Sequence, residues 1–457
     1  MLALIILFLT ALVTLFVGFA KKPLLTLSLS VLGLLGTGAA LICQWYHPSD
    51  FLSSYEGVNM DAFAILFSLV AIIFTILIIL SGFGQFKSRL DHTADYIGLL
   101  IFSLFGAIIM VSFQDLFMFF LGLEILSIPI YVMAGAKKDD PLSSESSLKY
   151  FITGAFATGI LLFGIAWLYG ATGTFKIYEI QQFFMEAEQI SSLAYVGLLF
   201  ILSAFLFKIG AAPFHFWSPD VYDGAPAPVT GFMAAVVKLG AFGAFIKLFT
   251  IAFSELYDFW MPALTFLAIL TMFVGNLSAI RQVRFKRLLA YSSIAHVGYS
   301  LITMVVLTDN SALNLWYYLF SYGFATIALI TVQMIVNDRE DRIEAFKGLG
   351  RANPFVGFVA VVALLALAGV PPLMGFFGKF LIFADAIAQN PALIAVALLN
   401  SGIGIFYYLR TVIVILQKPG VDNEIEQSEF KTTPLQLIVL GICVLAMLFG
   451  GGLLMIH

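Results

Sequence analysis

Charged residues and cysteines are scarce in this sequence. Only 11% of its 457 residues are Asp, Glu, Lys or Arg, and 61% are hydrophobic, whereas an average soluble domain is roughly 25% charged. This deficit excludes an ordinary soluble domain, and we expect no nucleic-acid partner. The two cysteines, Cys43 and Cys443, lie far apart without metal-ligand spacing, so we expect both to be small buried residues.

Several chemical motifs are absent as well. The sequence contains no Gly-rich phosphate loop opening a helix after a strand, no Cys-x-x-Cys set and no paired histidines at haem-ligand positions. We therefore expect no redox cofactor and no metal in this chain.

Long apolar runs are abundant. The mean hydropathy is +1.02, and the runs are apolar on all sides over about 20 residues, the length of a membrane-spanning helix. The sequence predicts an all-α polytopic membrane protein, because a β-barrel would alternate apolar and polar residues in shorter segments. Windows of about 19 residues predict fourteen spans. Their cores are 2–20, 24–43, 60–81, 95–110, 114–133, 149–169, 192–216, 226–250, 258–280, 286–307, 312–336, 355–388, 391–416 and 434–455.

The loops predict the orientation of these spans. If the N-terminus lies outside, the inner loops hold 17 of the 23 basic residues and the outer loops hold one, Lys176. Short loops rich in Lys and Arg stay in the cytoplasm, so we expect both termini on the periplasmic side of a bacterial inner membrane. The inner residues are Lys21, Lys22, Lys87, Arg89, Lys137, Lys138, Arg281, Arg284, Lys286, Arg287, Arg339, Arg342, Lys347, Arg351, Arg410, Lys418 and Lys431.

The five remaining basic residues lie within spans, and all are lysines: Lys149, Lys208, Lys238, Lys247 and Lys379. Arg keeps its proton in proteins, whereas a desolvated Lys can lose it. A lysine at the membrane centre costs at least roughly 2.5 kcal/mol on insertion scales. We therefore interpret these lysines as functional candidates.

Glu124 lies near the middle of the fifth span, in FLGLEILSIPIY. It is either a proton-binding carboxylate tuned by a lysine or an acid that fixes helix packing, and its depth favours the first interpretation. Lys208, in FLFKIGAAPFHFW, is its expected partner. Gly210 and Pro213 break the seventh span beside Lys208, and irregular backbone at membrane depth borders protein or a water-filled cavity.

The eighth span holds two lysines. We expect Lys238 to face inward. Lys247 follows nine residues later, on the opposite face and near the outer end. We therefore expect it to snorkel to the interface.

The tenth span contains LLAYSSIAHVGYS. Ser292, His296 and Tyr299 follow i, i+4, i+7 spacing and share one helix face. Such a row of hydroxyl, imidazole and phenol groups can order water and pass protons; the alternative is a histidine that only packs. His215, just past Lys208, is a candidate to continue a polar path to the cytoplasm. Lys149 lies one turn after Glu145, which favours an interfacial ion pair, with proton uptake as the alternative.

The twelfth span contains LALAGVPPLMGFFGKFLIF, in which small residues and prolines precede Lys379. This break lies five spans after the break beside Lys208, so the two segments cross the membrane in opposite directions. Corresponding broken helices in opposed halves are typical of inverted-repeat transporters. We expect five-helix repeats of spans four to eight and nine to thirteen. The resulting segments are 1–94 (three helices), 95–250, 251–416 and 417–457.

Four segments carry a resemblance to a known family. They are FLGLEILSIPIY, KIGAAPFHFWSPDVYDGAPAPVTGFMAAVVKLG, KRLLAYSSIAHVGYS and GVPPLMGFFGKF. Together they resemble the antiporter-like membrane subunits of respiratory complex I, most closely subunit N of the bacterial NADH:quinone oxidoreductase, over about residues 95–415. Lys379 stands where subunit M typically has a glutamate, and the long lateral helix of subunit L is not found.

The resemblance implies a proton-pumping translocase subunit with charged residues and water along the membrane midplane. It matches Glu124 to the family's acid in the fifth span and Lys149 to a lysine in the sixth. It matches Lys208, Lys238 and Lys379 to the lysines of the seventh, eighth and twelfth. NADH, FMN, iron–sulfur clusters and quinone are expected on other subunits. The expected partners are neighbouring membrane subunits of that complex, the lipid bilayer, protons and internal water.

The mechanism that we expect is a relay. Quinone reduction elsewhere weakens a Glu124–Lys208 pair, and Lys208 then changes the proton affinity of Lys238. Charge moves past His296 to Lys379, where the proton is released outside. Two alternatives stay open: a subunit of a multi-subunit cation/proton antiporter, and a scaffold whose buried charges only fix helix packing.

Overall fold

The computed structural model describes residues 1–47, 54–55, 57–89, 92–338, 340–418 and 430–455. Arg339, assigned above to an inner loop, lies outside the described residues, as do the side chains of Lys87 and Arg89.

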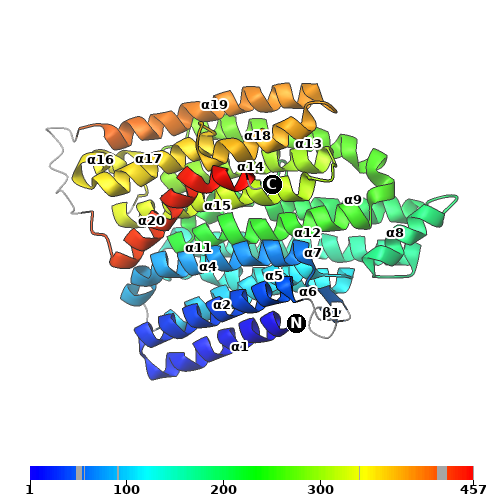
Figure 1. The fold of residues 1–457 in the computed structure, drawn as a ribbon, viewed down its shortest axis with the longest axis horizontal. Helices are drawn as coiled ribbons and strands as arrows, with labels where there is room; N and C mark the ends of the chain where they lie inside the picture. Colours follow the sequence, from blue (N-terminus) through cyan, green and yellow to red (C-terminus); the bar gives the residue numbers. More distant parts are fainter. Residues whose placement is uncertain (48–53, 56, 90–91, 339, 419–429, 456–457) are drawn as a thin grey trace.

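The described chain is almost entirely helical (Figure 1). Its first half comprises α1 (Leu2–Val17), η1 (Gly18–Ala20), α2 (Pro23–Tyr46), the hairpin strands β1 (Ser54–Tyr55) and β2 (Val58–Asn59), α4 (Ala62–Arg89), α5 (Thr93–Ser112), α6 (Leu116–Ala134), α7 (Pro141–Thr172), α8 (Ile177–Glu186), α9 (Ser192–Ile209), α10 (Trp217–Gly224), α11 (Ala227–Phe232), the π-helical turn η2 (Met233–Val237) and α12 (Lys238–Ile251). The second half comprises η3 (Ser254–Leu256), α13 (Tyr257–Ile280), α14 (Phe285–Val305), α15 (Ser311–Val336), η4 (Ile343–Phe346), α16 (Leu349–Ala352), α17 (Pro354–Ala368), α18 (Met374–Ala386), α19 (Pro391–Leu416), α20 (Pro434–Phe449) and η5 (Gly450–Met455).

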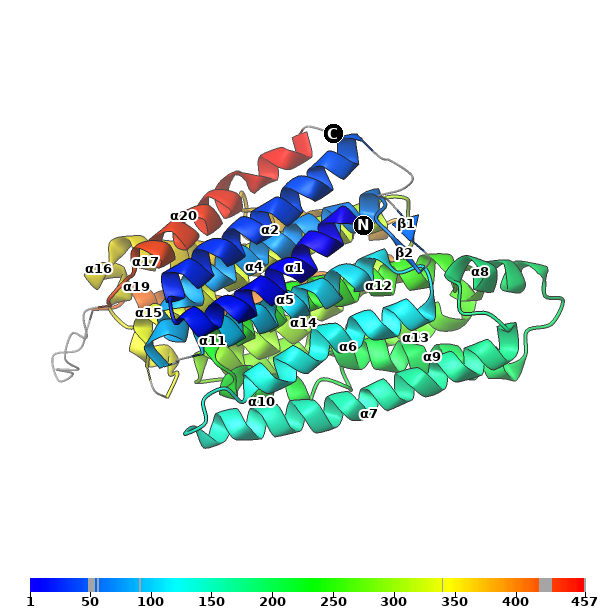
Figure 2. The same cartoon turned by 90° about the horizontal axis from the view of Figure 1, so that it is seen from below.

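The long helices run side by side along the longest axis of the molecule. α1 and α2 lie at one edge, and α19 lies at the opposite edge (Figure 1). α7 covers another face, far from α2 and α20 (Figure 2). The N-terminus, β1 and α8 lie at one end of the bundle and α16 at the other (Figure 1). This arrangement gives the bundle two ends, as a membrane-spanning protein requires.

The predicted spans are confirmed. Thirteen helices among the described residues are long and apolar enough to cross a membrane. The remaining predicted span, the twelfth, is α17 followed by α18, which begins after a five-residue break at 369–373. The seventh span is also discontinuous, because α9 ends at Ile209 and α10 begins at Trp217.

Both breaks begin at a glycine in the left-handed region. Gly210 has φ 75° and Gly369 has φ 84°, and each caps the preceding helix. Glycine adopts this conformation without the steric penalty of a Cβ, so it ends helices efficiently. The seventh and twelfth spans therefore end their first helix in the same way.

Some sequence-based expectations were wrong in detail. α7 begins at Pro141 after the capping residue Asp140, whose carboxylate accepts a hydrogen bond from the Leu142 amide at 3.1 Å. Lys149 therefore lies two turns inside this helix and does not begin it. Cys443 is buried but Cys43 is exposed, and both are free. The hairpin, α8 and η2 were not predicted.

The first two helices of each expected repeat pack through a glycine. A Cβ on Gly106 of α5 would lie 2.2 Å from the Leu126 amide nitrogen in α6. A Cβ on Gly275 of α13 would lie 2.3 Å from the Ala295 amide nitrogen in α14. Backbones this close leave no space for a side chain, and small residues commonly allow such approaches between membrane helices.

Gly275→Ala should therefore destabilise the protein, although alanine favours helices. The added methyl group must push α13 away from α14, and overpacking of this kind costs roughly 1–3 kcal/mol. The apparent melting temperature of the detergent-solubilised protein measures the effect. Gly159→Ala is the matched control, since a Cβ there meets nothing within 4 Å. Equal melting temperatures for the two variants would contradict the packing argument.

Candidate functional site

Three buried lysines lie next to irregular backbone. Two are on helices beside the breaks, and one begins the helix after η2. Lys208 is on α9, Lys238 begins α12, and Lys379 is on α18. All three side chains are buried, and each one donates a hydrogen bond to a serine hydroxyl. No ion pair to a carboxylate is found for these three lysines among the described residues.

Glu124 and Lys208 do not form the expected direct pair. The Lys208 Nζ donates to the Ser127 hydroxyl at 2.5 Å, while Glu124 Oε1 accepts a hydrogen bond from Thr158 Oγ1 at 2.7 Å. Ser127 follows Glu124 by one helical turn of α6, so it stands beside the carboxylate on the same helix. Glu124 and Lys208 therefore each bond to a hydroxyl, Thr158 and Ser127, and not to each other.

The end of α9 fixes the position of Lys208. The Ala211 amide donates to the Leu206 carbonyl at 2.9 Å, which closes the last turn around the Gly210 cap. Trp217 Nε1 donates to the Phe207 carbonyl at 3.0 Å and so ties α10 back to α9. The predicted break thus holds Lys208 inside the protein.

Lys238 is held by α14. Its Nζ donates to the Ser293 carbonyl at 3.0 Å and to the Ser293 hydroxyl. Tyr322 of α15 donates to the same hydroxyl at 2.8 Å, and the ammonium lies 5.8 Å from the centre of the Tyr322 ring. The π-helical turn η2 immediately precedes Lys238, and such turns frequently occur at functional sites.

The predicted polar stripe of α14 makes contacts along its whole length. Ser292 shares a hydrogen bond with Tyr408, His296 Nε2 lies 3.1 Å from the Tyr408 hydroxyl, and His296 Nδ1 lies 2.6 Å from the Tyr318 hydroxyl. Asn276 donates to the Tyr299 hydroxyl at 3.3 Å. The three predicted residues are therefore all buried within one polar region.

Lys379 lies beside the second break. Its Nζ donates to the Ala368 carbonyl at 3.1 Å and to the Ser401 hydroxyl at 3.0 Å. The ammonium lies 4.9 Å from the centre of the Tyr299 ring. A Cβ on Gly369 would lie 3.0 Å from the Lys379 side chain. The break therefore supplies both a free carbonyl and the space for the lysine.

Lys149 joins a charged group near the ends of α7, α10 and α14. Its Nζ lies 2.6 Å from Glu145, as predicted, and 2.6 Å from Asp220 of α10, which was not predicted. Asp220 also accepts a hydrogen bond from Arg287 of α14 at 2.7 Å. Asp220 therefore links the first half of the chain to the second.

Lys286, counted above among the loop lysines, is buried instead. Its Nζ donates to the carbonyls of Asp223 at 2.5 Å and Ala225 at 3.0 Å. Its amide donates to the Asp341 carboxylate at 2.6 Å. Burial raises the pKa of Asp341, although Lys286 and the hydrogen bonds from the Lys286 amide and Gln333 work in the opposite direction. This burial could not be predicted from the sequence, because Lys286 stands among other basic loop residues.

The expectation for Lys247 was wrong. Its side chain is buried, with Nζ 3.5 Å from the Asp61 carboxylate and 3.3 Å from the Val111 carbonyl. It therefore connects α12 to the start of α4 and the end of α5. His215 is also buried, and its Nδ1 has no hydrogen-bond partner among the described residues. His215 thus does not join the hydrogen-bonded groups above.

α19 contributes residues that sequence reasoning missed. Asn400, Ser401, Tyr407 and Tyr408 contact the groups around Lys379 and His296. Their spacing of one, seven and eight residues places them on one face of a helix. Four polar residues at this spacing in an otherwise apolar span are the signal that would have found them.

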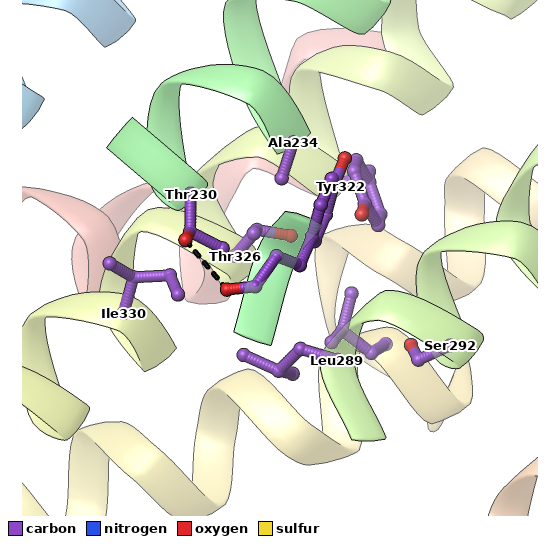
Figure 3. A pocket seen from close by; sticks show the side chains of 9 residues that line it. Thr230, Ala234, Leu289, Ser292, Tyr322, Thr326 and Ile330 are labelled. Atoms are coloured by element: carbon purple, nitrogen blue, oxygen red, sulfur yellow. Dashed lines mark hydrogen bonds between the residues drawn. The ribbon is translucent and has the colours of Figure 1, made fainter. Parts of the chain in front are cut away.

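A narrow cavity lined by both polar and apolar side chains lies between η2, α14 and α15 (Figure 3). Thr230 at its edge donates to the Tyr222 carbonyl at 2.9 Å. Tyr322 and Ser292 connect it to the surroundings of Lys238 and His296. Its lining residues are Tyr222, Thr230, Ala234, Leu289, Ser292, Tyr322, Thr326, Ile330 and Leu367.

The sequence that forms this bundle matches a known membrane family over more than half of its length. The family described as NADH:quinone oxidoreductase/Mrp antiporter, TM matches residues 114–404. The chain belongs to this family. A relative named NADH-quinone oxidoreductase subunit N, from Cytophaga hutchinsonii, is 38% identical over 96% of this chain and 95% of the relative. A relative of the same name from Trichlorobacter lovleyi is 38% identical over 86% of this chain and 82% of its own.

Solved structures of membrane complexes contain chains with a similar fold. A chain of respiratory complex I from Thermus thermophilus with bound aureothin has a TM-score of 0.84 and 31% identity, covering 98% of this chain and 96% of that one. A chain of the Mrp complex from Dietzia sp. DQ12-45-1b has a TM-score of 0.83 at 20% identity, covering 98% and 95%. The second likeness concerns the fold alone.

Asp220→Asn should lower the free energy of unfolding by about 1–2 kcal/mol, because it weakens two partly exposed ion pairs at once. Thermal unfolding of the detergent-solubilised protein at neutral pH measures the loss. Asp309→Asn, which changes an exposed carboxylate, should leave the stability unchanged. If both variants unfold like the parent, the link through Asp220 contributes no stability.

Proposed function

We propose that this chain is a proton-translocating membrane subunit, of the subunit N type, of an NADH:quinone oxidoreductase. It couples quinone reduction elsewhere in the complex to proton movement. The observation that carries the proposal is the buried row of Lys208, Lys238 and Lys379, each bonded to a serine hydroxyl. The relatives named above support it.

Lysine suits this task for a chemical reason. Arg would stay protonated, whereas Lys can exchange its proton when desolvated. A neutral serine partner lets the lysine lose its proton without leaving an unpaired carboxylate behind. Glu124, Lys208, Lys238, His296 and Lys379 form the relay.

The mechanism starts at Glu124. When quinone is reduced elsewhere, the hydrogen bond of Lys208 switches between the Ser127 hydroxyl and the Glu124 carboxylate. This switch changes the electric field at Lys238. Moving one proton against about 150 mV requires roughly 3.5 kcal/mol. A direct ion pair at 4 Å contributes up to about 4 kcal/mol at an effective dielectric constant near 20. One such switch is therefore of the size needed for one proton.

The proton then passes Lys238 and the stripe of Ser292, His296 and Tyr299 toward Lys379. Lys149 and its partner Asp220 lie near the inner end, where protons would be taken up. The cavity beside Tyr322 (Figure 3) supplies polar side chains between that end and Lys238. His215 lies close to Lys208 in the sequence and is a second candidate for uptake.

The location that we propose is a bacterial inner membrane, with both termini on the periplasmic side. The distribution of basic residues between the loops supports this orientation. Residues 95–250 and 251–416 form the two inverted repeats, preceded by three helices in 1–94 and followed by the segment 417–457. The matching left-handed glycines at the two breaks support this division.

NADH, FMN, iron–sulfur clusters and quinone belong to other subunits in this proposal. The partners of the chain are the neighbouring membrane subunits, lipid, protons and internal water. A subunit of a cation/proton antiporter is the second candidate. It is less favoured, because the likeness to the Mrp complex has 20% identity and the complex I chain has 31%.

Lys238→Arg tests the proposal in the assembled complex reconstituted in vesicles. The variant keeps the positive charge but cannot release the proton. Proton pumping per NADH oxidised should fall by about 100-fold or more, the usual contribution of a positioned proton-transfer group. Lys176→Arg, at an exposed lysine, is the control and should pump like the parent.

Full pumping by Lys238→Arg would contradict the relay. Glu124→Gln separates the relay from a scaffold role. The relay predicts normal assembly with impaired pumping, whereas a scaffold predicts that the amount of assembled complex falls at least as much as pumping does.

A further inference from the structure

Asn276 of α13 is a buried amide that the proposed relay does not use. Its side chain is 1% exposed, in a helix that is long and apolar enough to cross a membrane. A buried amide at this depth is costly unless its polar atoms find hydrogen-bond partners. The partners of Asn276 therefore indicate its role.

Asn276 joins α14 to α19. Its Nδ2 donates to the Tyr299 hydroxyl of α14 and to Asn400 Oδ1 of α19, both at 3.3 Å. Its Oδ1 accepts a hydrogen bond from the Tyr407 hydroxyl of α19 at 3.0 Å. The nitrogen and the oxygen of the amide are thus both engaged, which fixes the orientation of the side chain.

The residues around Asn276 are themselves held in place. Asn400 donates to the Val396 carbonyl, one turn earlier in α19, at 3.1 Å. A Cβ on Gly404 would lie 3.3 Å from Asn276 Oδ1 and 3.6 Å from the Tyr407 hydroxyl. The glycine therefore leaves the amide its space against α19.

The ring of Tyr299 lies against α18. The Lys379 ammonium is 4.9 Å from the centre of this ring, and the ring of Phe383, one turn after Lys379, is 6.2 Å from it. An aromatic ring at this distance from an ammonium stabilises the positive charge. The Tyr299 ring therefore adds to the hydrogen bonds that Lys379 makes with Ser401 and the Ala368 carbonyl.

Asn276 holds the hydroxyl end of the Tyr299 side chain. Two rotatable bonds connect a tyrosine ring to its backbone, so the ring can shift relative to a neighbouring group. The hydrogen bond from Asn276 to the hydroxyl restricts this movement. Asn276 can therefore affect the charge on Lys379 without contacting the lysine.

We propose that Asn276, supported by Tyr407 and Asn400, is a positioning residue that holds the Tyr299 ring against Lys379 and thereby stabilises the protonated lysine. No proton passes through Asn276, because its amide does not titrate. The inference rests on the proposed function, in which Lys379 is the last lysine of the relay.

Asn276→Ala and Tyr299→Phe test the inference in the assembled complex reconstituted in vesicles. Each variant removes the hydrogen bond between the two residues, and Tyr299→Phe keeps the ring. Proton pumping per NADH oxidised should fall about fivefold in each variant, the factor that corresponds to the loss of one ordinary hydrogen bond.

The double variant separates positioning from helix packing. If Asn276 acts through the Tyr299 hydroxyl, adding Asn276→Ala to Tyr299→Phe should leave pumping at the level of Tyr299→Phe alone. If Asn276 only packs α13 against α19, the added substitution should lower pumping by the same factor as in the parent, and this result overturns the inference. Parent-like pumping in Asn276→Ala overturns it as well.

Tyr317→Phe is the matched control and should pump like the parent, because its buried hydroxyl donates to the Gly450 carbonyl at 3.2 Å, outside the contacts of Asn276. If Asn276→Ala does not assemble, Tyr407→Phe replaces it, since it removes the hydrogen bond to Asn276 Oδ1 and keeps the ring. Pumping should then fall about twofold, and only while Tyr299 is present; no fall, or an equal fall beside Tyr299→Phe, overturns the inference.

Lys238→Arg distinguishes the failure of this inference from the failure of the proposed function. If Lys238→Arg pumps normally, the proposed function itself fails. If Lys238→Arg does not pump while Asn276→Ala pumps like the parent, only the role of Asn276 is wrong.

Discussion

The main physical constraint on this structure is the burial of lysines at membrane depth without a direct ion pair to a carboxylate. Lys208, Lys238 and Lys379 each meet this constraint with a serine hydroxyl, and the last two also use a backbone carbonyl. A carboxylate partner would hold the proton on the lysine, whereas a hydroxyl can serve both the charged and the neutral form. In the proposed function, the hydrogen-bond partner therefore decides whether a buried lysine fixes helix packing or exchanges its proton.

Lys247 has a carboxylate partner instead of a hydroxyl partner. It is buried as well, but its Nζ lies 3.5 Å from Asp61, and its contacts join three helix ends. Among these four buried lysines, Lys247 thus has a carboxylate partner, whereas the other three have hydroxyl partners. This contrast in partners supports the proposed difference between a lysine that fixes helix packing and lysines that exchange protons.

Much of the fold could be predicted from the sequence because bilayer physics is local. Apolar length fixes the spans, and glycine with proline marks the breaks at Gly210 and Gly369. Helix ends were less predictable, as the early start of α7 at Pro141 shows, because capping by Asp140 extends a helix beyond its apolar core.

Only some residues of the candidate site could be predicted from the sequence. Ser292, His296 and Tyr299 were found because their spacing places them on one helix face. Ser127, Ser293 and Ser401 were not, since an isolated serine in an apolar span gives no signal until a lysine from another helix reaches it. Lys208 was expected to pair directly with Glu124, and the choice of Ser127 instead is set by tertiary packing between α6 and α9.

The most direct test of the hydroxyl-partner account is the proton-to-electron ratio of the assembled complex carrying Ser293→Asp. A carboxylate at this position would form an ion pair with Lys238 and hold the proton on the lysine. The account predicts that the complex assembles and oxidises NADH while its proton-to-electron ratio falls. An unchanged ratio, with Lys238 paired to the new carboxylate, would contradict it.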